Sequence, residues 1–272
     1  PYWVSYSEMV NFAGGKSVFI PAKFEDGFAL DLEAMERSIN DKTRVILFSS
    51  PSNPAGSSLS YDQLKQIADI VKRHPHVTVI SDEIYEHINF DGEHTSISQF
   101  DGVKDQLIIV NGVSKGFAMT GWRIGYMVGP KEIIAACDKL QGQFTSGANS
   151  IAQWAAVEAI NGDMKPTQSM VDTFRGRRDM LVEMLSEIPG IETDTPKGAF
   201  YLFPKVSSLY GKEFGGRKIN DSLDLCDYIL NNALVSLVPG VAFGMDEHVR
   251  ISYASSEEEL KEAMRRIKAA LT

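Results

Sequence analysis

The first half of the chain alternates short apolar runs with longer amphipathic stretches. Helical patterns begin at Asp31, at Ser60 and at Pro130, and Ser60 is a residue type that often precedes the first turn of a helix. Runs typical of buried strands occupy residues 16–22, 44–49, 77–81, 106–111 and 123–129. Because buried strands that alternate with helices form parallel sheets, this half predicts an α/β fold. We expect a mainly parallel sheet with helices on both faces.

The second half of the chain has longer helices and then shorter elements. One helical stretch covers residues 150–188, with a break near Gly162 and Pro166. After it, the pattern predicts a strand at 199–203, a helix at 221–232, a strand at 234–238 and a final helix from Ser256. We therefore expect a large domain at 1–165 that is incomplete at its N-terminus, a linking helix at 166–188, and a smaller α+β domain at 189–272.

Composition and charge exclude several classes of function. The chain has 272 residues and a net charge of −9, which argues against a nucleic-acid partner because such partners require a basic face. No run of 18 apolar residues predicts a membrane span. Cys137 and Cys226 have no metal-ligand spacing, and neither do the five histidines, which we expect at the surface or in support of a site. We predict no metal, reduced thiols and a cytoplasmic location.

Polar residues follow three of the predicted strands, at the edge of the sheet where ligands bind in open α/β folds. They are Ser52–Gly56, Asp82–Tyr85 and Ser114–Arg123. Taken alone, these segments indicate a turn, a helix cap and a solvated loop. Taken together, they supply a lysine amine that can form an imine with an aldehyde and an acid that can hold a proton on a ring nitrogen. They also supply an arginine whose planar fork fits a phosphate, so the set suits a pyridine-phosphate cofactor.

The third loop carries the most specific pattern in the chain. Residues 111–126, NGVSKGFAMTGWRIGY, closely resemble the lysine signature of the class I (fold-type I) aminotransferases, above all their bacterial aspartate and aromatic branch. The same family has motifs similar to SNPAG at 52–56, DEIY at 82–85 and RISY at 250–253, in the same order, and an aromatic segment similar to Pro1–Trp3. This resemblance implies the fold-type I architecture and pyridoxal 5′-phosphate as the cofactor.

The resemblance also implies roles for residues that would act on the cofactor ring. Lys115 would form the imine and then act as the base that moves a proton. Asp82 would hold the proton of the ring nitrogen. Tyr85 and Asn53 would donate hydrogen bonds to the phenolic oxygen of the cofactor.

Further roles concern the phosphate, the ring face and the substrate. Arg123 would bind the phosphate with help from Ser114, and Trp3 would stack on the ring, unless it is a core tryptophan. Arg250 would hold the α-carboxylate of the substrate, beside Asn53. By pattern alone, Arg250 could equally form a surface ion pair.

Two other segments are candidates for a position near the site. Phe200 and Tyr201 are expected either at the mouth of the substrate site or in the core. Residues 144–149, FTSGAN, resemble a segment that in the family reaches the cofactor site of the partner subunit, which predicts a homodimer. Relatives also carry further residues before the point that matches Pro1, so we expect the chain on its own to bind the cofactor poorly.

Several functions fit these residues. The first is transfer of an amino group between an amino acid and a 2-keto acid, with aspartate and 2-oxoglutarate as the first choice and aromatic amino acids or alanine next. A β-lyase would share every residue above. A regulator domain that binds the cofactor without turnover is the third, although the intact Asp82, Lys115 and Arg250 favour catalysis.

Overall fold

The computed structural model describes residues 1–272, and internal contacts divide them into two compact units. Unit 1 consists of Pro1–Ala29, Ser52–Ser57 and Val171–Thr272. Unit 2 consists of Leu30–Pro51 and Ser58–Met170. No helix is long and apolar enough to span a membrane.

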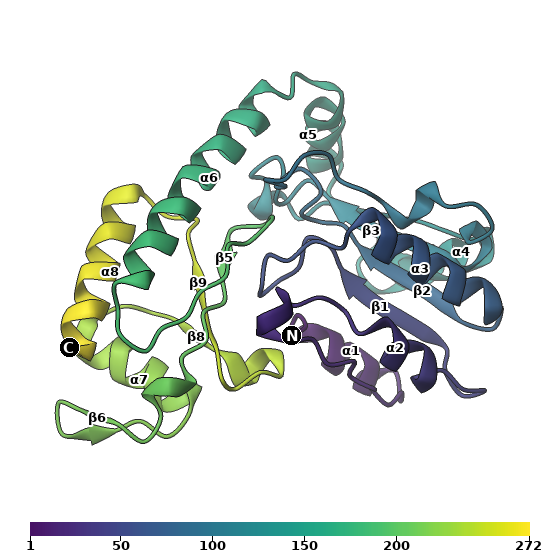
Figure 1. The fold of residues 1–272 in the computed structure, drawn as a ribbon. Helices are drawn as coiled ribbons and strands as arrows, with labels where there is room; N and C mark the ends of the chain where they lie inside the picture. Colours follow the sequence, from purple (N-terminus) through teal and green to yellow (C-terminus); the bar gives the residue numbers. More distant parts are fainter. The chain divides into compact units, whose positions relative to one another are not determined.

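A four-stranded sheet forms the centre of unit 2 (Figure 1). Its strands lie in the order β1 (Val45–Ser49), β2 (Thr78–Asp82), β3 (Leu107–Gly112) and β4 (Gly125–Val128). The first three are parallel, and β4 runs antiparallel to β3. The expected mainly parallel sheet is thus confirmed. In the register, Asp82 pairs with Ser49 on one side and with Val110 on the other, so the loops after β1, β2 and β3 leave the same edge.

The helices of unit 2 begin where the sequence predicts. They are α2 (Leu32–Ser38), α3 (Tyr61–Arg73), α4 (Lys131–Phe144) and α5 (Ser150–Asn161). Ser60 and Gln63 form a reciprocal capping box at the start of α3, and the Asp31 side chain caps α2. Helix α3 buries one apolar face, and α5 packs Ala152 and Ala156 against Val113 and Ile124. Short 3-10 turns lie at Ile97–Gln99, Lys104–Gln106 and Thr120–Trp122.

Unit 1 is built on a small antiparallel sheet, three complete helices and most of a fourth, longer helix. The sheet has the order β5 (Tyr201–Leu202), β9 (Val249–Ser252), β8 (Val238–Pro239), and a separate hairpin pairs β6 (Glu213–Phe214) with β7 (Arg217–Lys218). Helices α7 (Ser222–Ala233) and α8 (Glu257–Leu271) contact each other and complete this α+β unit. A short helix α1 (Ser5–Phe12), which the sequence did not indicate, buries none of its residues.

Two predicted strands differ from the structure. Residues 16–21 form no strand, because no neighbouring segment pairs with them, and the Phe19 ring instead stacks on Tyr2 at 4.5 Å. The strand predicted at 234–238 is reduced to Val238–Pro239, since Leu234 adopts a left-handed φ of 55° as it ends α7. Apolar residues alone predicted both strands, whereas a strand also requires a partner for its backbone groups.

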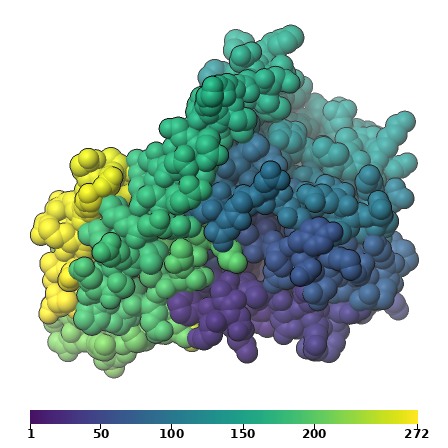
Figure 2. Space-filling view, turned by 45° about the horizontal axis from the view of Figure 1, so that its top comes forward, coloured from purple at the N-terminus to yellow at the C-terminus, as the bar shows by residue number.

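Helix α6 (Lys165–Ser186) occupies the region where a linking helix was predicted. It buries one face through Val171, Phe174, Leu181 and Leu185. The teal-to-green band across the surface in Figure 2 includes this helix. The boundary between the two units falls within this helix, after Met170. Residues 1–29 group with the C-terminal unit because, for example, Tyr2 N donates to Phe243 O at 3.2 Å. The predicted domain limits at 165 and 188 stay a prediction.

Candidate active site

Backbone hydrogen bonds fix the end of β2, where Asp82 lies. Ser50 N donates to Asp82 O at 3.1 Å, and Glu83 N donates to Val110 O at 2.9 Å. The Asp82 carboxylate accepts a hydrogen bond from Ile84 N at 3.2 Å. The loop after β2 is therefore held to the strands on both sides, and with it the position of the Asp82 carboxylate.

Lys115 follows the end of the neighbouring strand β3 by three residues. Its Nζ lies 5.8 Å from the centroid of the Tyr85 ring, and that ring is buried. The structure thus brings Lys115 and Tyr85 together at the sheet edge where β2 ends in Asp82. Ser114, predicted beside the phosphate, is half-buried in the same loop. An amine, a phenol and a carboxylate at one edge can bind and protonate a polar aromatic ligand.

The backbone beside Lys115 is closely packed. A Cβ atom on Gly116 would lie 2.6 Å from Cδ2 of His87, so only glycine fits against that ring. Thr167 Oγ1 donates to Gly116 O at 3.0 Å, and the His87 ring meets Phe117 edge-on at 5.2 Å. These contacts fix the conformation of the loop and so preorganise the position of Lys115.

A buried glutamate directly after Asp82, for which the sequence pattern predicted no role, anchors a second loop. Glu83 is 3% exposed, and its Oε1 accepts hydrogen bonds from Ser81 Oγ and Ser96 Oγ, both at 2.9 Å. Its Oε2 lies 3.0 Å from His94 Nε2. Three donors satisfy this buried carboxylate, as burial of a charge requires. The signal in the sequence was a second acid at the end of a buried strand.

The same glutamate belongs to the one group of side chains that could hold a metal ion. Possible ligand atoms of Glu83, Glu86 and His94 lie within 4.8 Å of one another. The hydrogen bonds of Glu83 explain its burial without an ion.

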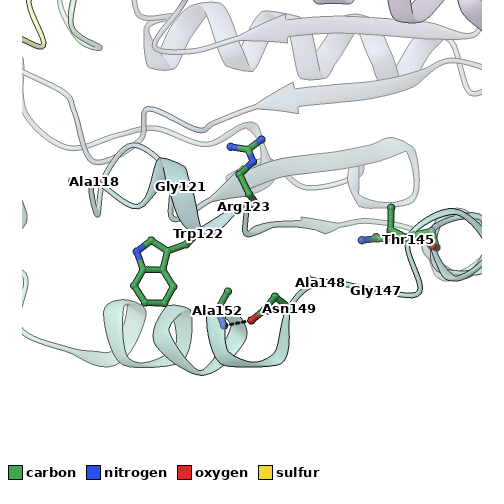
Figure 3. A pocket seen from close by; sticks show the side chains of 10 residues that line it. Ala118, Gly121, Trp122, Arg123, Thr145, Gly147, Ala148, Asn149 and Ala152 are labelled. Carbon is green, nitrogen blue, oxygen red and sulfur yellow. Dashed lines mark hydrogen bonds between the residues drawn. The ribbon is translucent and has the colours of Figure 1, made fainter.

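Arg123 borders a cavity of about 720 Å³ in unit 2. Its φ of 57° is left-handed, so the chain turns sharply there, and β4 begins at Gly125 rather than at the predicted residue 123. Arg123 Nη1 donates to Thr120 O at 2.8 Å. Figure 3 shows the side chains of Trp122 and Arg123 extending to opposite sides of the turn.

The predicted partner-reaching segment contributes the other wall of this cavity. Thr145, Gly147, Ala148 and Asn149 line it, and all four are exposed. The Asn149 side chain caps α5 by accepting from Ala152 N at 3.0 Å, as Figure 3 shows. Arg123 and the segment 144–149, predicted separately, therefore line one cavity.

Unit 1 brings together the two residues predicted to bind substrate. Arg250 Nη1 donates to Asn53 Oδ1 at 2.8 Å, although 197 residues separate them in the sequence. Asn53 is buried in the turn 52–57, which packs tightly on the loop before β5: Lys197 N and Gly198 N both donate to Gly56 O at 2.9 Å. Gly56 has a φ of +65°, and a Cβ atom there would lie 2.6 Å from Gly198 O. Glycine is therefore required in this turn.

Trp3 lies in unit 1, where its ring meets Tyr6 edge-on at 5.4 Å. It is 37% exposed, so it is not the core tryptophan that the sequence left open as an alternative. Its predicted stacking on a cofactor ring stays a prediction.

His248 is a buried residue that the sequence placed at the surface or in support of a site. It is fully buried, its ring stacks on Phe203 at 4.8 Å, and it has Phe24 and Phe28 as further ring neighbours. Neither ring nitrogen has a hydrogen-bond partner. Burial lowers the pKa of His248 to about 4, and the positive charge of Lys205 adds to this shift while Glu25 opposes it. The histidine is neutral at pH 7.

The family comparison covers nearly the whole chain. Residues 1–267 match the sequence model of the family described as aminotransferase class I and II. A bifunctional aspartate aminotransferase and glutamate/aspartate-prephenate aminotransferase of Petunia hybrida is 51% identical over 100% of this chain. A probable aspartate/prephenate aminotransferase of Rickettsia felis is 45% identical over 99% of it.

Solved structures agree with this likeness. The crystal structure of the aspartate aminotransferase from Rhizobium meliloti superposes with a TM-score of 0.95 at 44% identity, over 100% of this chain and 68% of that one. A Thermus thermophilus aspartate aminotransferase with maleate superposes with a TM-score of 0.90 at 38% identity, over 100% of this chain and 68% of that one. The chain spans 58% of the length of the petunia relative and 67% of the Rickettsia one.

Proposed function

This chain belongs to the class I and II aminotransferase family, and from that membership we propose that the complete protein transfers an amino group from an amino acid to a 2-keto acid. Class I aminotransferases use pyridoxal 5′-phosphate. The observation that carries the proposal is the placement of the Lys115 amine over the Tyr85 ring, at the edge where β2 ends in Asp82.

The side chains in unit 2 fit this cofactor by their chemistry. An amine, a carboxylate, a phenol and a guanidinium lie in the loops after β2 and β3, and Gly116 keeps the lysine loop close to His87. We expect Lys115, Asp82 and Tyr85 to hold the ring, and Arg123 with Ser114 to hold the phosphate. Trp3 is expected on the ring face and Asn53 at the phenolic oxygen. When bound, the ring withdraws electrons from the substrate carbon.

Each of these residues then has a defined task. The Asp82 carboxylate would keep a proton on the ring nitrogen, because an ion pair there favours the charged form. Tyr85 orients the phenolic oxygen through its hydroxyl. The amine of Lys115 would move a proton between the substrate Cα and the C4′ carbon of the cofactor, which is general acid–base catalysis.

Arg250 and Asn53 form the site for the α-carboxylate of the substrate in this proposal. The guanidinium offers two parallel donors to a carboxylate, which suits every amino acid and every 2-keto acid. Asn53 already accepts from Nη1 at 2.8 Å, and this hydrogen bond fixes the rotation of the fork.

Aspartate is our proposed amino donor, with 2-oxoglutarate as the acceptor. The petunia and Rickettsia relatives carry aspartate and prephenate in their names, so prephenate is the second acceptor to test. We further expect a homodimer, in which residues 144–149 face the partner subunit. The two free cysteines, Cys137 and Cys226, support a reducing compartment such as the cytoplasm.

The test uses the complete protein loaded with pyridoxal phosphate. Aspartate is added with 2-oxoglutarate or with prephenate, and the keto-acid product is measured. Lys115→Ala is expected to lower the rate by about 100- to 10,000-fold, the usual share of a general base. Lys104→Ala, an exposed lysine before β3, is the matched control and should leave the rate unchanged. Full turnover by Lys115→Ala would rule out the assignment.

A further inference from the structure

The guanidinium of Arg250 lies over the rings of Tyr201 and Phe243, and neither ring has a part in the function proposed above. Its Cζ is 4.5 Å from the centroid of the Tyr201 ring and 4.9 Å from the centroid of the Phe243 ring. Both rings are buried, whereas Arg250 is half-buried. A cation this close to two ring centroids is attracted by both, and the attraction strengthens where water is excluded.

The two rings are themselves fixed by the small sheet of unit 1. Tyr201 lies in β5 and pairs with Ser252 of β9, two residues beyond Arg250. Phe243 ends a 3-10 turn at Gly240–Phe243 that directly follows β8, and Val238 of that strand pairs with Arg250. The ring positions are therefore set by the same strand that carries the arginine.

A buried aromatic cluster ties Phe243 to the turn that carries Asn53. Phe243 meets Phe203 edge-on at 5.9 Å, and the cluster also includes Phe28 and Ala55. Ala55 lies two residues after Asn53. The packing of this one cluster therefore positions both Asn53, which accepts from Arg250 Nη1, and the Phe243 ring, which lies against the guanidinium.

Ring contacts and the hydrogen bond have different effects on the arginine. The rings favour positions of the guanidinium over their faces, because a cation is attracted to the face of an aromatic ring. The Asn53 hydrogen bond fixes the direction of Nη1. A side chain restricted in this way loses less conformational entropy when it binds a carboxylate.

We propose that Tyr201 and Phe243 are positioning residues that hold Arg250 in the orientation that receives the substrate carboxylate. This inference rests on the proposed function, in which Arg250 is the carboxylate site. The sequence allowed Tyr201 to lie either at the mouth of the substrate site or in the core. In this proposal Tyr201 is a core residue that affects substrate binding through Arg250.

If the rings act by positioning Arg250, their loss should slow the reaction only of substrates that carry a carboxylate. The test therefore compares a substrate that has a carboxylate with one that lacks it. Tyr201→Leu and Phe243→Leu keep a buried apolar side chain but remove the ring, while Tyr201→Phe keeps the ring and is the matched control. The complete protein with its cofactor is mixed with alanine or with ethylamine, which is alanine without its carboxylate. The rate of the spectral change of the cofactor is measured for each.

We expect each leucine variant to react about 3- to 30-fold more slowly with alanine, as the loss of one cation–π contact predicts. Its rate with ethylamine should change less than twofold, and Tyr201→Phe, which keeps the ring, should retain more of the alanine rate than Tyr201→Leu. Equal losses with alanine and ethylamine would show a merely structural role. No loss with alanine would also overturn the proposal.

A second measurement separates this proposal from the proposed function. Calorimetry on the complete protein with its cofactor gives the dissociation constant of maleate, a dicarboxylate, and the leucine variants should raise it by a similar factor. Ring-dependent maleate binding without any amino transfer would refute the proposed function alone. Absence of maleate binding by the wild type, or identical binding by all variants, would refute the positioning role.

Discussion

The proposed carboxylate site of unit 1 and the Arg123 cavity of unit 2 hold their arginines in different ways. Arg250 has a side-chain acceptor and two buried rings around it, all from the described chain. Arg123 is exposed, and its guanidinium donates to the carbonyl oxygen of Thr120 in its own turn. One arginine is preorganised by its surroundings, and the other is placed only by its backbone.

The surroundings of the Arg123 cavity point to the same contrast. Trp122 beside it is 47% exposed, Phe144 is 83% exposed, and Trp154 on α5 is 75% exposed. Large exposed apolar side chains on one unit are typical of a surface that contacts another segment or subunit. The chain spans 58% of the petunia relative, so length is available in such relatives for that contact. The residues that orient Arg250 all belong to unit 1. The Arg123 cavity, in contrast, is open, and we expect another segment or subunit to complete it.

Exchange of the two arginines for glutamine should separate their roles, and it carries the largest expected effect. Arg250→Gln in the complete protein should lower kcat/KM for aspartate by about 30- to 5,000-fold, since truncation of one partner of a hydrogen-bonded charge pair costs about 2–5 kcal/mol. Arg123→Gln should instead raise the dissociation constant of pyridoxal phosphate by about 10-fold or more. Steady-state kinetics and a cofactor titration measure the two quantities.

Arg44→Gln, at an exposed arginine before β1, is the control for both measurements. If Arg250→Gln weakened the cofactor as strongly as Arg123→Gln, the division of labour between the two arginines would be wrong.

The elements that the sequence predicted well are those with a local signal. Ser60 with Gln63, and Ser256 with Glu259, place capping boxes at the starts of α3 and α8, and both helices begin there. The strand predicted at 16–22 failed because pairing is not a local property. Strand β9, which carries Arg250, was not predicted, because a segment of four residues is too short for an alternating pattern to be recognised.

The candidate site shows the same limit. Asp82, Lys115 and Arg123 could be found because each stands in a recognisable motif after a strand. The ring contacts of Tyr201 and Phe243 with Arg250, and the donors around Glu83, join residues far apart in the chain. Nothing in the local sequence distinguishes these residues from ordinary core or loop positions.

Loss of the Glu83 carboxylate should destabilise unit 2 and leave the carboxylate site of unit 1 intact. Glu83→Ala leaves Ser81, Ser96 and His94 without a shared acceptor, and we expect a loss of about 2–3 kcal/mol in the free energy of unfolding. Urea unfolding with hydrogen exchange read separately in each unit provides the measurement. Glu93→Ala, an exposed glutamate nearby, should be neutral. An equal loss of protection in unit 1 would contradict the contrast between the units.

Acid should destabilise unit 1, because this unit buries His248, a histidine whose pKa is lowered by burial. The pKa of His248 is about 4 in the folded chain and near 6.5 when unfolded, so the unfolded chain binds more protons between these values. Stability is therefore lost as the pH falls from about 6.5 to 4, by on the order of 2 kcal/mol. His248→Phe should remove this dependence in urea titrations at pH 7, 5.5 and 4.5.

The control for this acid effect is His76→Gln, at an exposed histidine of unit 2, which should keep the wild-type pH dependence. A His248→Phe variant that still lost stability between pH 6.5 and 4 would show that another group is responsible.

The smallest expected effect tests whether the two units differ in their sites or simply in their general stability. Asp31 caps α2 in unit 2 and Ser256 caps α8 in unit 1, each by accepting a hydrogen bond from a backbone N–H in the first turn. Asp31→Ala and Ser256→Ala should each cost about 1 kcal/mol, the usual value of such a cap. Hydrogen exchange in the two helices measures both losses. Equal losses would mean that ordinary local interactions have equal strength in both units, so that the contrast between Arg250 and Arg123 arises from what surrounds each arginine. A loss several times larger in α2 than in α8 would instead make weak packing of unit 2 the simpler explanation for its open cavity.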